Sequence, residues 1–432
     1  MTVTRRTLLG ATGAAGLVTA AGGYRMLGES AEAATTLPAP GRSGIKHVVV
    51  VMMENRSFDH FLGWLPGADG KQAGLSYVDR YGVRHPTHHL DITASCGFND
   101  PDHSFEGGRV ELNGGRCNGW LRTGQNDSLS IGYYEQADLA FLGSAVPDWT
   151  TFDRYFSAVM AETYPNRFYL HGGRTDRLHN GDRPLSQPFP YPTIWSRLIA
   201  KGVSHAYYYA DSFPLFPVLL KHGPTNKRPF TQFLTDAAAG DLPSVSYIDP
   251  RFTGEESGVS NDDHPHADIR AGEDFMNQVY AAVTASPAWP DTVLVFTYDE
   301  WGGFFDHVAP GRAHDVSSTT ALRGFRVPTV LVSPFARRGH VDHAVYDHTS
   351  ILKLIEWRWG LKSLTPRDHY ARNLALALDF ADKDTSFSPY VVPPFTPTAC
   401  GASPAAEKGG PEYAEWEGLR DHILRQEGGA PR

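Results

Sequence analysis

The sequence predicts an α/β fold built on a mostly parallel sheet that is covered on both faces. Three segments are β-branched, nearly continuous apolar runs of strand length, and strands without polar alternation are typical of sheets flanked by helices. The three runs are His47–Met53, Thr292–Tyr298 and 327–332. Helical patterns lie between them along the chain, which favours the α/β class over an all-β fold.

The helical segments and the linkers complete this expectation. Apolar residues at helical spacing predict helices over Ile194–Lys201, 267–285, 350–359 and 413–426. Residues 385–410 are rich in Pro, Ser, Thr and Ala, which predicts an extended surface arm. Residues 65–150 are rich in Gly, Asn, Asp and His, which indicates loops and small insertions that cap the sheet. We therefore expect a catalytic domain over 35–384, followed over 385–432 by the arm and a C-terminal helix packed on it.

Composition and charge exclude several classes of protein. Among 432 residues there are 43 Gly and 31 Pro, too few for a low-complexity chain, and 41% are hydrophobic, which excludes intrinsic disorder. The formal net charge is −9 without a basic tail, which argues against a nucleic-acid partner and against a general attraction to anionic membranes.

The first 34 residues have the layout of a signal peptide. Arg5 and Arg6 precede an uncharged stretch rich in Ala, Gly, Thr and Leu, and small residues follow at 31–34. The arginine pair indicates a twin-arginine signal, so we expect the export machinery of that route as a partner and a secreted or cell-envelope location. An uncleaved anchor is the alternative, although no stable transmembrane anchor is expected.

Three cysteines rule out a disulfide-built miniature fold. Cys96 and Cys117 are close enough in sequence to form a bridge outside the cell, which would leave Cys400 unpaired. The alternative is three buried, unreactive thiols. A structural zinc finger is excluded, because the sequence has no CxxC and no Cys/His zinc spacing.

Two of the predicted strands are followed directly by adjacent oxygen-bearing side chains. Glu54 and Asn55 follow the first run, and Asp299 and Glu300 follow the second. Ligands bind at the carboxyl ends of strands in α/β sheets, and such oxygens suit a hard divalent cation. The alternative is that these residues are solvated loop acids or helix N-caps.

A hydroxyl at a predicted helix start supplies a candidate nucleophile. Thr163 precedes Pro165, a residue typical of the first helical turn, where backbone amides can bind phosphate. A metal that lowers its pKa would activate the hydroxyl. Taken alone, a threonine at this position is more often only an N-cap.

Three histidines lie beside acids in loop-like contexts: His103, His264 and His348. A neighbouring carboxylate keeps an imidazole partly protonated near neutral pH, as a leaving-group acid requires. We expect at least one of the three to be catalytic.

Taken together, these motifs resemble the bacterial phosphoesterase family of phosphatidylcholine-type phospholipases C and related acid phosphatases. The resemblance covers about residues 45–380 and rests on motifs that occur in family order at 54–60, 102–104, 163–167, 262–265, 298–308, 327–335 and 347–350. It implies an alkaline-phosphatase-like α/β/α sandwich with capping loop insertions.

The resemblance also assigns roles to individual residues. It implies that Glu54, Asn55, Asp299 and Glu300 bind the metal, that Thr163 is the nucleophile, and that His103 and His264 contact phosphate or protonate the leaving group. The residues that it implies for substrate binding are Tyr133, Tyr134, Glu135 and Asn166, and the two tyrosine rings could cradle a choline cation.

The expected activity is metal-dependent hydrolysis of a phosphoric ester through a phosphothreonine intermediate. In the family that the chain resembles, acid phosphatases tend to have serine at the nucleophile position and phospholipases threonine. The resemblance therefore favours a phospholipase C acting on phosphatidylcholine-like phospholipids over an acid phosphatase acting on small monoesters. A non-catalytic exported binding protein is the third reading. The oxygen-rich ligand set suits Ca²⁺, Mg²⁺ or Mn²⁺, and Zn²⁺ stays open.

Overall fold

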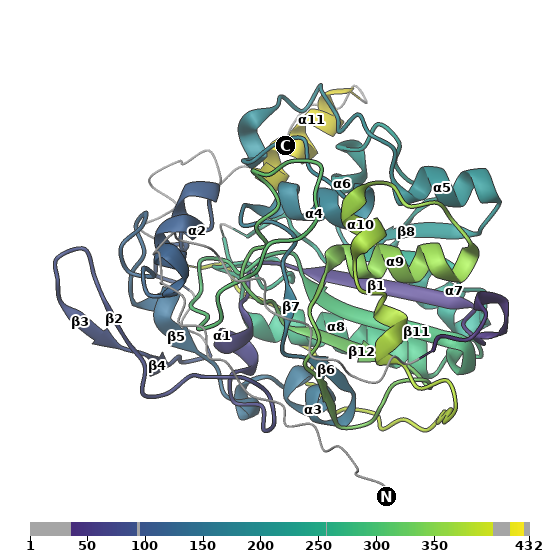
Figure 1. The fold of residues 1–432 in the computed structure, drawn as a ribbon, viewed down its shortest axis with the longest axis horizontal. Helices are drawn as coiled ribbons and strands as arrows, with labels where there is room; N and C mark the ends of the chain where they lie inside the picture. Colours follow the sequence, from purple (N-terminus) through teal and green to yellow (C-terminus); the bar gives the residue numbers. More distant parts are fainter. Residues whose placement is uncertain (1–35, 93–95, 256, 401–414, 427–432) are drawn as a thin grey trace, which may run out of the picture.

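The computed structural model describes residues 36–92, 96–255, 257–400 and 415–426. The predicted signal peptide at 1–34 and residues 401–410 of the predicted arm lie outside these ranges. The described residues form a central sheet with helices on both faces and a cap of small elements at one end (Figure 1).

The main sheet has eight strands in the order β13-β6-β12-β11-β1-β10-β8-β9. Every strand except β12 runs in the same direction, because β12 pairs antiparallel with both of its neighbours. The predicted α/β class with a mostly parallel sheet is confirmed. The strands are β1 His47–Met53, β6 Thr150–Phe152, β8 His205–Tyr209, β9 Lys227–Pro229, β10 Val245–Asp249, β11 Thr292–Tyr298, β12 Thr329–Val332 and β13 His340–Asp342.

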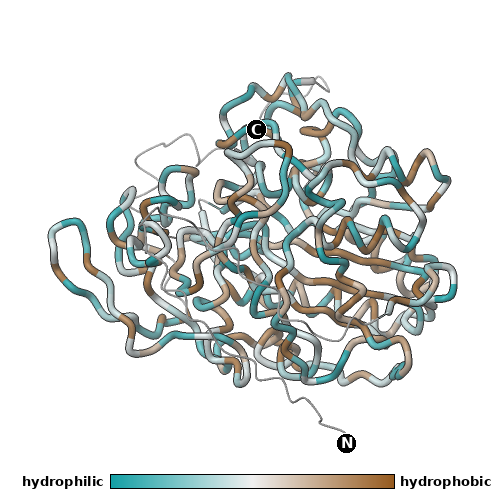
Figure 2. Tube along the Cα trace, in the orientation of Figure 1, coloured by the Kyte–Doolittle hydropathy of each residue, from teal (hydrophilic) through white to brown (hydrophobic). Residues whose placement is uncertain are grey.

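The two longest strands form the centre of the sheet because their side chains are apolar on both faces. β1 and β11 are buried along nearly their whole length, and Figure 2 shows hydrophobic residues concentrated along the central strands. The predicted bounds of both strands are confirmed. The third predicted run, 327–332, forms strand only from Thr329, and the segment that leads to it from β11 contains no crossover helix among the described residues. Without a crossover, a strand returns antiparallel to its predecessor.

Helices cover both faces of the sheet, with α4, α5 and α9 on one side and α7 and α8 on the other (Figure 1). The four predicted helices are present, with bounds that differ by at most two residues at either end. The helices are α1 Phe58–Leu62, α2 Phe105–Leu112, α3 Leu142–Asp148, α4 Thr163–Gly172, α5 Ile194–Lys201, α6 Leu215–Val218, α7 Phe230–Ala239, α8 Ile269–Thr284, α9 His348–Trp359, α10 Pro366–Tyr370 and α11 Glu415–Gln426.

The cap consists of α1, α2 and short strand pairs, whereas α3 packs beside β6 of the main sheet. These pairs are β2 Ser76–Val78 with β3 Arg84–Pro86, β4 His88–His89 with β5 Gly132–Tyr133, and β7 Tyr155–Phe156 with β14 Tyr346–Asp347. The hairpin of β2 and β3 extends beyond the rest of the molecule at the left of Figure 1. A separate small apolar cluster, with Trp120, Trp301 and Phe305 at its centre, fixes the base of the cap.

The C-terminal helix α11 shares the main core. Trp416 is buried and stacks on Phe252, with ring centroids 4.1 Å apart, and its edge contacts Tyr164 in α4. The described part of the arm contains neither helix nor strand, and Tyr390 anchors it by stacking on Tyr280. Among the described residues, none of the helices has the length and apolar character needed to cross a bilayer.

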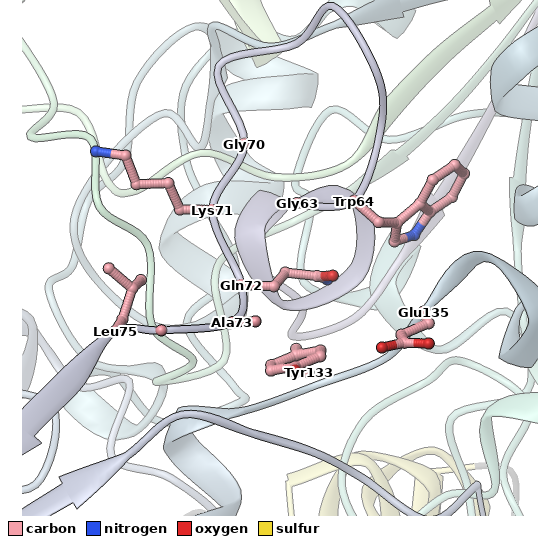
Figure 3. A pocket seen from close by; sticks show the side chains of 10 residues that line it. Gly63, Trp64, Gly70, Lys71, Gln72, Ala73, Leu75, Tyr133 and Glu135 are labelled. Atoms are coloured by element: carbon pink, nitrogen blue, oxygen red, sulfur yellow. The ribbon is translucent and has the colours of Figure 1, made fainter.

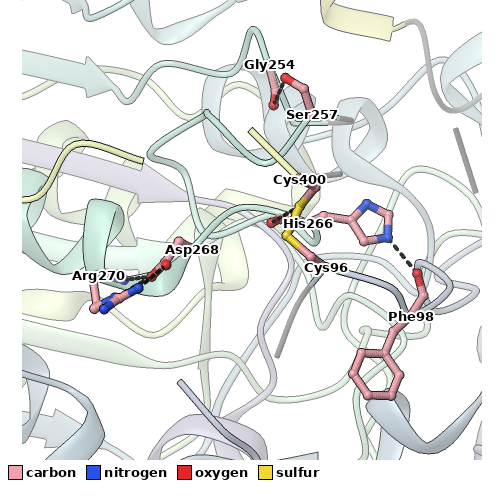
Figure 4. The surroundings of a disulfide bond; sticks show 8 residues. All are labelled: Cys96, Phe98, Gly254, Ser257, His266, Asp268, Arg270 and Cys400. Atoms are coloured by element: carbon pink, nitrogen blue, oxygen red, sulfur yellow. Dashed lines mark hydrogen bonds and ion pairs between the residues drawn. A yellow bond between two sulfur atoms is a disulfide. The ribbon is translucent and has the colours of Figure 1, made fainter. Parts of the chain in front are cut away.

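The expected Cys96–Cys117 bridge is wrong. Cys96 forms a disulfide with Cys400, 304 residues away, and Cys117 is a buried free thiol (Figure 4). Proximity in sequence misled the prediction, because Cys117 points into the apolar cluster of the cap. The bridge ties the arm to the segment that begins at Cys96, and the His266 carbonyl lies near Cys400 at the same place.

If α11 stabilises the catalytic domain, replacing Trp416 should lower its stability. We expect Trp416→Ala to reduce the free energy of unfolding by about 3–5 kcal/mol, because it removes a fully buried ring. Urea unfolding followed by circular dichroism measures the change. Val391→Ala is the control, since Val391 is 94% exposed and should unfold like the parent. Equal stability of the two variants would contradict a structural role for α11.

Candidate functional site

The carboxyl ends of β1 and β11 bring four oxygen-bearing side chains together. The two strands pair in parallel with Met53 opposite Tyr298, so the residues that follow them meet at one edge of the sheet. The backbone amide of Asn55 donates a hydrogen bond to Asp299 Oδ1 over 3.2 Å. Glu54, Asn55, Asp299 and Glu300 are all fully buried, as a clustered ligand set requires and as solvated loop acids are not.

The two loops that carry these residues cross in contact. Asn55 adopts a left-handed backbone conformation with φ of 58°, and Gly302 does the same with φ of 63°. A Cβ atom at Gly302 would lie 2.2 Å from the Asn55 carbonyl oxygen, so only glycine fits there. The Gly302 amide donates to Glu300 Oε2 over 2.7 Å and orients that carboxylate.

Thr163 is the first residue of α4, as predicted, and its hydroxyl lies inside the site. Its Oγ1 donates to Glu54 Oε2 over 3.2 Å. Among the other amides of the first turn, that of Tyr164 donates to Asn180 and that of Asn166 to the Glu162 carbonyl, while Pro165 has none. Among the described residues, the Thr163 amide is thus the one first-turn N–H group that stays available to an anion. The sequence had suggested several such groups.

Asn166 supports the turn that carries Thr163. Its Oδ1 accepts from the Val159 amide, and its Nδ2 donates to the carbonyls of Ala161 and Glu162. Because these contacts engage both ends of the side-chain amide, Asn166 positions the turn, and its expected role in substrate binding stays a prediction.

Arg167 is the central charge of the site, and the sequence analysis missed its role. It lies four residues after Thr163, on the same face of α4. Its guanidinium contacts Glu54 over 2.9 Å, Asp249 over 3.2 Å and Asp299 over 3.3 Å. Asp249 is the last residue of β10, so three neighbouring strands each direct a carboxylate at one guanidinium.

Burial dominates the electrostatics of these acids. Burial and then the Asp299 charge raise the pKa of Glu54 well above its ordinary value, and Arg167 opposes this shift. Burial likewise raises the pKa of Glu300 and of Asp299. It raises the pKa of Asp249 to about 6. Without a cation, these carboxyl groups therefore hold protons more strongly than exposed acids do.

Two of the three histidines face this cluster. His103 donates from Nδ1 to the Pro101 carbonyl, and its Nε2 lies 4.0 Å from Glu300 Oε1. The His264 ring lies 5.9 Å from the His103 ring, centroid to centroid, and its Nε2 is 3.9 Å from Asp100 Oδ2. Burial and then the His103 charge lower the pKa of His264 well below its ordinary value. In the substrate-free protein, His264 is therefore neutral at physiological pH.

The third histidine, His348, has a structural contact. It begins α9 and donates from Nε2 to the Asp299 carbonyl over 2.6 Å. Burial lowers the pKa of His348 to about 4. It therefore braces the loop that carries Asp299 and Glu300 as a neutral side chain.

The donor atoms present fit a divalent cation. Asn55 Oδ1 and Glu300 Oε1 are buried, and neither accepts a hydrogen bond. Such unsatisfied oxygens are costly unless a cation binds them. One oxygen of Asp100 and one nitrogen each of His103 and His264 also lie within 4.8 Å of one another, so nitrogen ligands adjoin the oxygen set.

A second acidic cluster in the cap is already neutralised. Asp59, Asp306 and His307 lie close together, but Arg326 contacts Asp59 over 2.9 Å and Asp306 over 3.0 Å. His307 also donates to Asp59. This cluster is a buried ion-pair network that supports the loop after Trp301.

The segment expected to hold a choline head group lies apart from the metal-type cluster. Tyr133 and Glu135 line a cavity of about 420 Å³ with Trp64 and Gln72, and none of the residues described above lines it (Figure 3). Tyr134 is fully buried, and its ring packs in the core against His60 and Phe61. The Tyr134 ring thus lies in the core, whereas Tyr133 and Glu135 reach the cavity, and the role expected of these residues in substrate binding stays a prediction.

Comparison with known proteins gives consistent matches. A family model described as "Phosphoesterase family" matches residues 45–362. The chain is 33% identical to non-specific phospholipase C1 of Arabidopsis thaliana over 374 residues, which cover 76% of this chain and 69% of that protein. It is 29% identical to non-hemolytic phospholipase C of Pseudomonas aeruginosa (92% and 69% covered) and 28% identical to phospholipase C A of Mycobacterium tuberculosis (82% and 81% covered).

Solved structures give weaker similarities. A protein in the alkaline phosphatase superfamily from Vibrio parahaemolyticus aligns with a TM-score of 0.41 and 12% identity, over 78% of this chain and 71% of that one. The lipoteichoic acid synthase LtaP from Listeria monocytogenes aligns with a TM-score of 0.40 and 9% identity, over 91% and 94%.

Cation binding should depend on pH because protons and the cation compete for the same carboxyl groups. We expect the affinity of the metal-free protein for Mn²⁺ or Zn²⁺ to rise from about pH 5 to about pH 8, with protons released on binding. Raised pKa values also mean that the metal-free protein loses stability as pH rises through them. Calorimetry in two buffers of different ionisation enthalpy measures the released protons. Binding without proton release, at an affinity independent of pH, would contradict the competition.

Removing the Arg167 charge should destabilise the fold. We expect Arg167→Met to cost about 3–5 kcal/mol, because it leaves buried carboxylates without their counter-charge. Urea unfolding in the presence of chelator measures the loss. Arg183→Met is the control, because that arginine is partly exposed and its buried partner Asp176 keeps the contact with Arg177 over 2.9 Å. If Arg167→Met unfolds at the same urea concentration as the parent, the ion pairs of Arg167 do not stabilise the fold.

Proposed function

The chain belongs to the Phosphoesterase family, and from this premise we propose that it is a phospholipase C that acts through Thr163. The family match and the phospholipase C relatives make the chain a hydrolase that acts on phosphoric esters. The observation that carries the proposal is the Thr163 hydroxyl, 3.2 Å from Glu54 among buried oxygens that fit a cation. A non-catalytic binding protein would not need a complete set of this kind.

In the first step, Thr163 Oγ attacks phosphorus and the bond from phosphorus to the diacylglycerol oxygen breaks. Glu54 Oε2 already accepts the hydrogen bond of the Thr163 hydroxyl, so the proton that leaves the hydroxyl has an acceptor beside it. The Thr163 amide and Arg167 lie on the same helix and favour negative charge at this point. A bound divalent cation would supply further positive charge for the phosphate oxygens and favour the ionised hydroxyl.

The leaving alcohol needs a proton, and His264 or His103 supplies it. Both rings are held at Nδ1 by backbone carbonyls, so Nε2 is the atom that faces the cluster. Burial lowers the pKa of His264, whereas an anionic phosphate bound beside the ring would favour the protonated form. Water then attacks the phosphothreonine, the bond from Oγ to phosphorus breaks, and Thr163 regains its proton as the phosphorylated head group leaves.

Export is the second part of the proposal, supported by sequence and by the disulfide. The Arg5-Arg6 pattern is typical of the twin-arginine route. The Cys96–Cys400 bridge fits an oxidising compartment outside the cytoplasm. A secreted or cell-envelope location would place the enzyme where it meets phospholipid.

Two chromogenic substrates test the substrate class. With added divalent metal, we expect faster release from p-nitrophenylphosphocholine than from p-nitrophenyl phosphate, because the phospholipase reading requires a diester. The reverse order would make the chain a phosphomonoesterase. Release from neither, with phosphatidylcholine vesicles also intact, would contradict both.

The role of Thr163 has its own test. We expect Thr163→Ala to lower kcat by at least about 1000-fold and Thr163→Ser to retain measurable turnover, because serine keeps a nucleophilic hydroxyl. Thr235→Ala, at an exposed position of α7, is the matched control. Acid quenching during turnover should trap phosphate on the peptide that contains Thr163. Full activity of Thr163→Ala would reject the assignment.

A further inference from the structure

The tip of the β2–β3 hairpin exposes apolar side chains away from the protein body. Tyr81 is 84% exposed and Val83 is 53% exposed, and Figure 1 shows the hairpin extending past the cap. Scattered single apolar residues on a surface need no explanation. Here an aromatic and an aliphatic side chain lie two residues apart at the outermost point of a projecting element.

The tip is a defined turn, not a loose loop. Asp79 Oδ1 accepts hydrogen bonds from the amides of Tyr81 and Val83, both over 2.8 Å. The other carboxylate oxygen of Asp79 contacts His85 over 2.9 Å. The Asp79 amide donates to the Val83 carbonyl and closes the turn. The two apolar side chains are thus held outward by the backbone of the turn.

Three exposed arginines lie on and beside the hairpin. Arg80 donates to the Gly124 carbonyl over 2.6 Å, Arg84 to Ser76 Oγ over 2.9 Å, and Arg122 to the Val78 carbonyl over 3.2 Å. In the described parts of the chain, no carboxylate forms an ion pair with any of these three. The two carboxylates that adjoin the tip are engaged elsewhere, Asp79 with His85 and Asp127 with the Asn99 amide. In a protein of net charge −9, the three arginines therefore leave local positive charge around this exposed apolar pair.

The hairpin is coupled to the active-site edge of the molecule. The segment that receives the Arg80 hydrogen bond also contains Thr123, whose hydroxyl donates to Asp102 over 2.5 Å, and Asp102 precedes His103. At the base of the hairpin, Tyr77 belongs to the small apolar cluster that includes Trp301, the residue after Glu300. The tip therefore projects from the side of the sheet on which the proposed phosphoryl transfer occurs.

We propose that this tip, with Tyr81 and Val83 outermost and Arg80, Arg84 and Arg122 around it, docks on the surface of a phospholipid bilayer. The inference rests on the proposed phospholipase function. Tyrosine rings favour the membrane interface, where the ring meets acyl chains and the hydroxyl meets water, and arginines pair with lipid phosphates. A protein partner fits less well, because specific interfaces bury about 800 Å² on each side and this tip is small and convex.

Vesicle binding tests the docking surface independently of turnover. We expect the double substitution Tyr81→Ser/Val83→Ser to weaken co-sedimentation with phosphatidylcholine vesicles about tenfold, because it removes the apolar contact. The matched control is Tyr370→Ser/Val391→Ser, which removes exposed apolar side chains elsewhere. Equal binding by the tip variant and the parent, or equal losses in the two double variants, would overturn the proposal.

Charge and depth of insertion give two further measurements. With phosphatidylglycerol added to the vesicles, each of Arg80→Gln, Arg84→Gln and Arg122→Gln should weaken binding about fivefold, whereas Arg42→Gln, before the amino end of β1, should not. Tyr81→Trp should gain fluorescence quenching by lipids brominated in the acyl chain, and Tyr370→Trp should not. Insensitivity to all three arginines, or quenching equal to that of Tyr370→Trp, would overturn the proposal.

Activity measurements separate this inference from the proposed function. The tip variant should hydrolyse dissolved p-nitrophenylphosphocholine like the parent and vesicle phosphatidylcholine more slowly. If the parent hydrolyses neither lipid nor diester but still binds vesicles through the tip, the docking surface stands and the phospholipase assignment fails. If the parent hydrolyses vesicles at a rate that the tip substitutions leave unchanged, the function stands and the docking surface is rejected.

Discussion

This site depends on the contacts between the Arg167 guanidinium and three buried carboxylates. β11, β1 and β10 are neighbours in the sheet, and their carboxyl ends place Asp299, Glu54 and Asp249 around one point. Buried acids at such spacing repel one another and resist ionisation unless positive charge lies among them. Because Arg167 and Thr163 are one helical turn apart, the helix that balances the acids also delivers the hydroxyl. Structure and chemistry therefore share a single helix.

The surroundings of that helix follow from the same constraint. The Phe252 ring centroid lies 4.6 Å from the Arg167 guanidinium, and Trp416 stacks on Phe252 with its own ring centroid 5.9 Å from the same guanidinium. The C-terminal helix thus acts on the site through aromatic packing, at a distance from any phosphate. Asn166 and His348 act similarly, because they contact backbone groups that hold Thr163 and Asp299 in place.

Much of the fold and of the cluster could be predicted because each strand, and the polar residues that directly follow it, form a pattern that is local in the sequence. The strands at 47–53 and 292–298 are continuous apolar runs, and their end residues had to meet once the strands were parallel. β10 and β8 were missed because Val245–Asp249 and His205–Tyr209 mix Ser, Tyr and His with apolar residues, and Asp249 was missed with them. Arg167 stood in a recognised motif, but only the folded chain shows three strands converging on it.

The long-range contacts were beyond sequence reasoning for the same reason. The partner of Cys96 is 304 residues away, whereas Cys117 is near in sequence but turned into the apolar cluster. The burial of Tyr134 could not be predicted from its motif either. Tyr133 ends β5 and Tyr134 follows it, and adjacent side chains of extended backbone point to opposite sides. Alternation placed one ring at a cavity and the other in the core.

The disulfide turns most of the molecule into a covalent ring with β1 outside it. Residues 96–400 are closed into a loop, and β1, which lies between β10 and β11, belongs to the open segment before Cys96. A mechanical force applied to the two ends of the chain could extend only the segments outside the ring. Such a force would have to pull β1 out of the sheet, because the disulfide prevents the segment between Cys96 and Cys400 from being extended. The resistance of this protein to mechanical unfolding would therefore come from two elements outside the ring, β1 between its two parallel neighbours and α11 packed on Phe252.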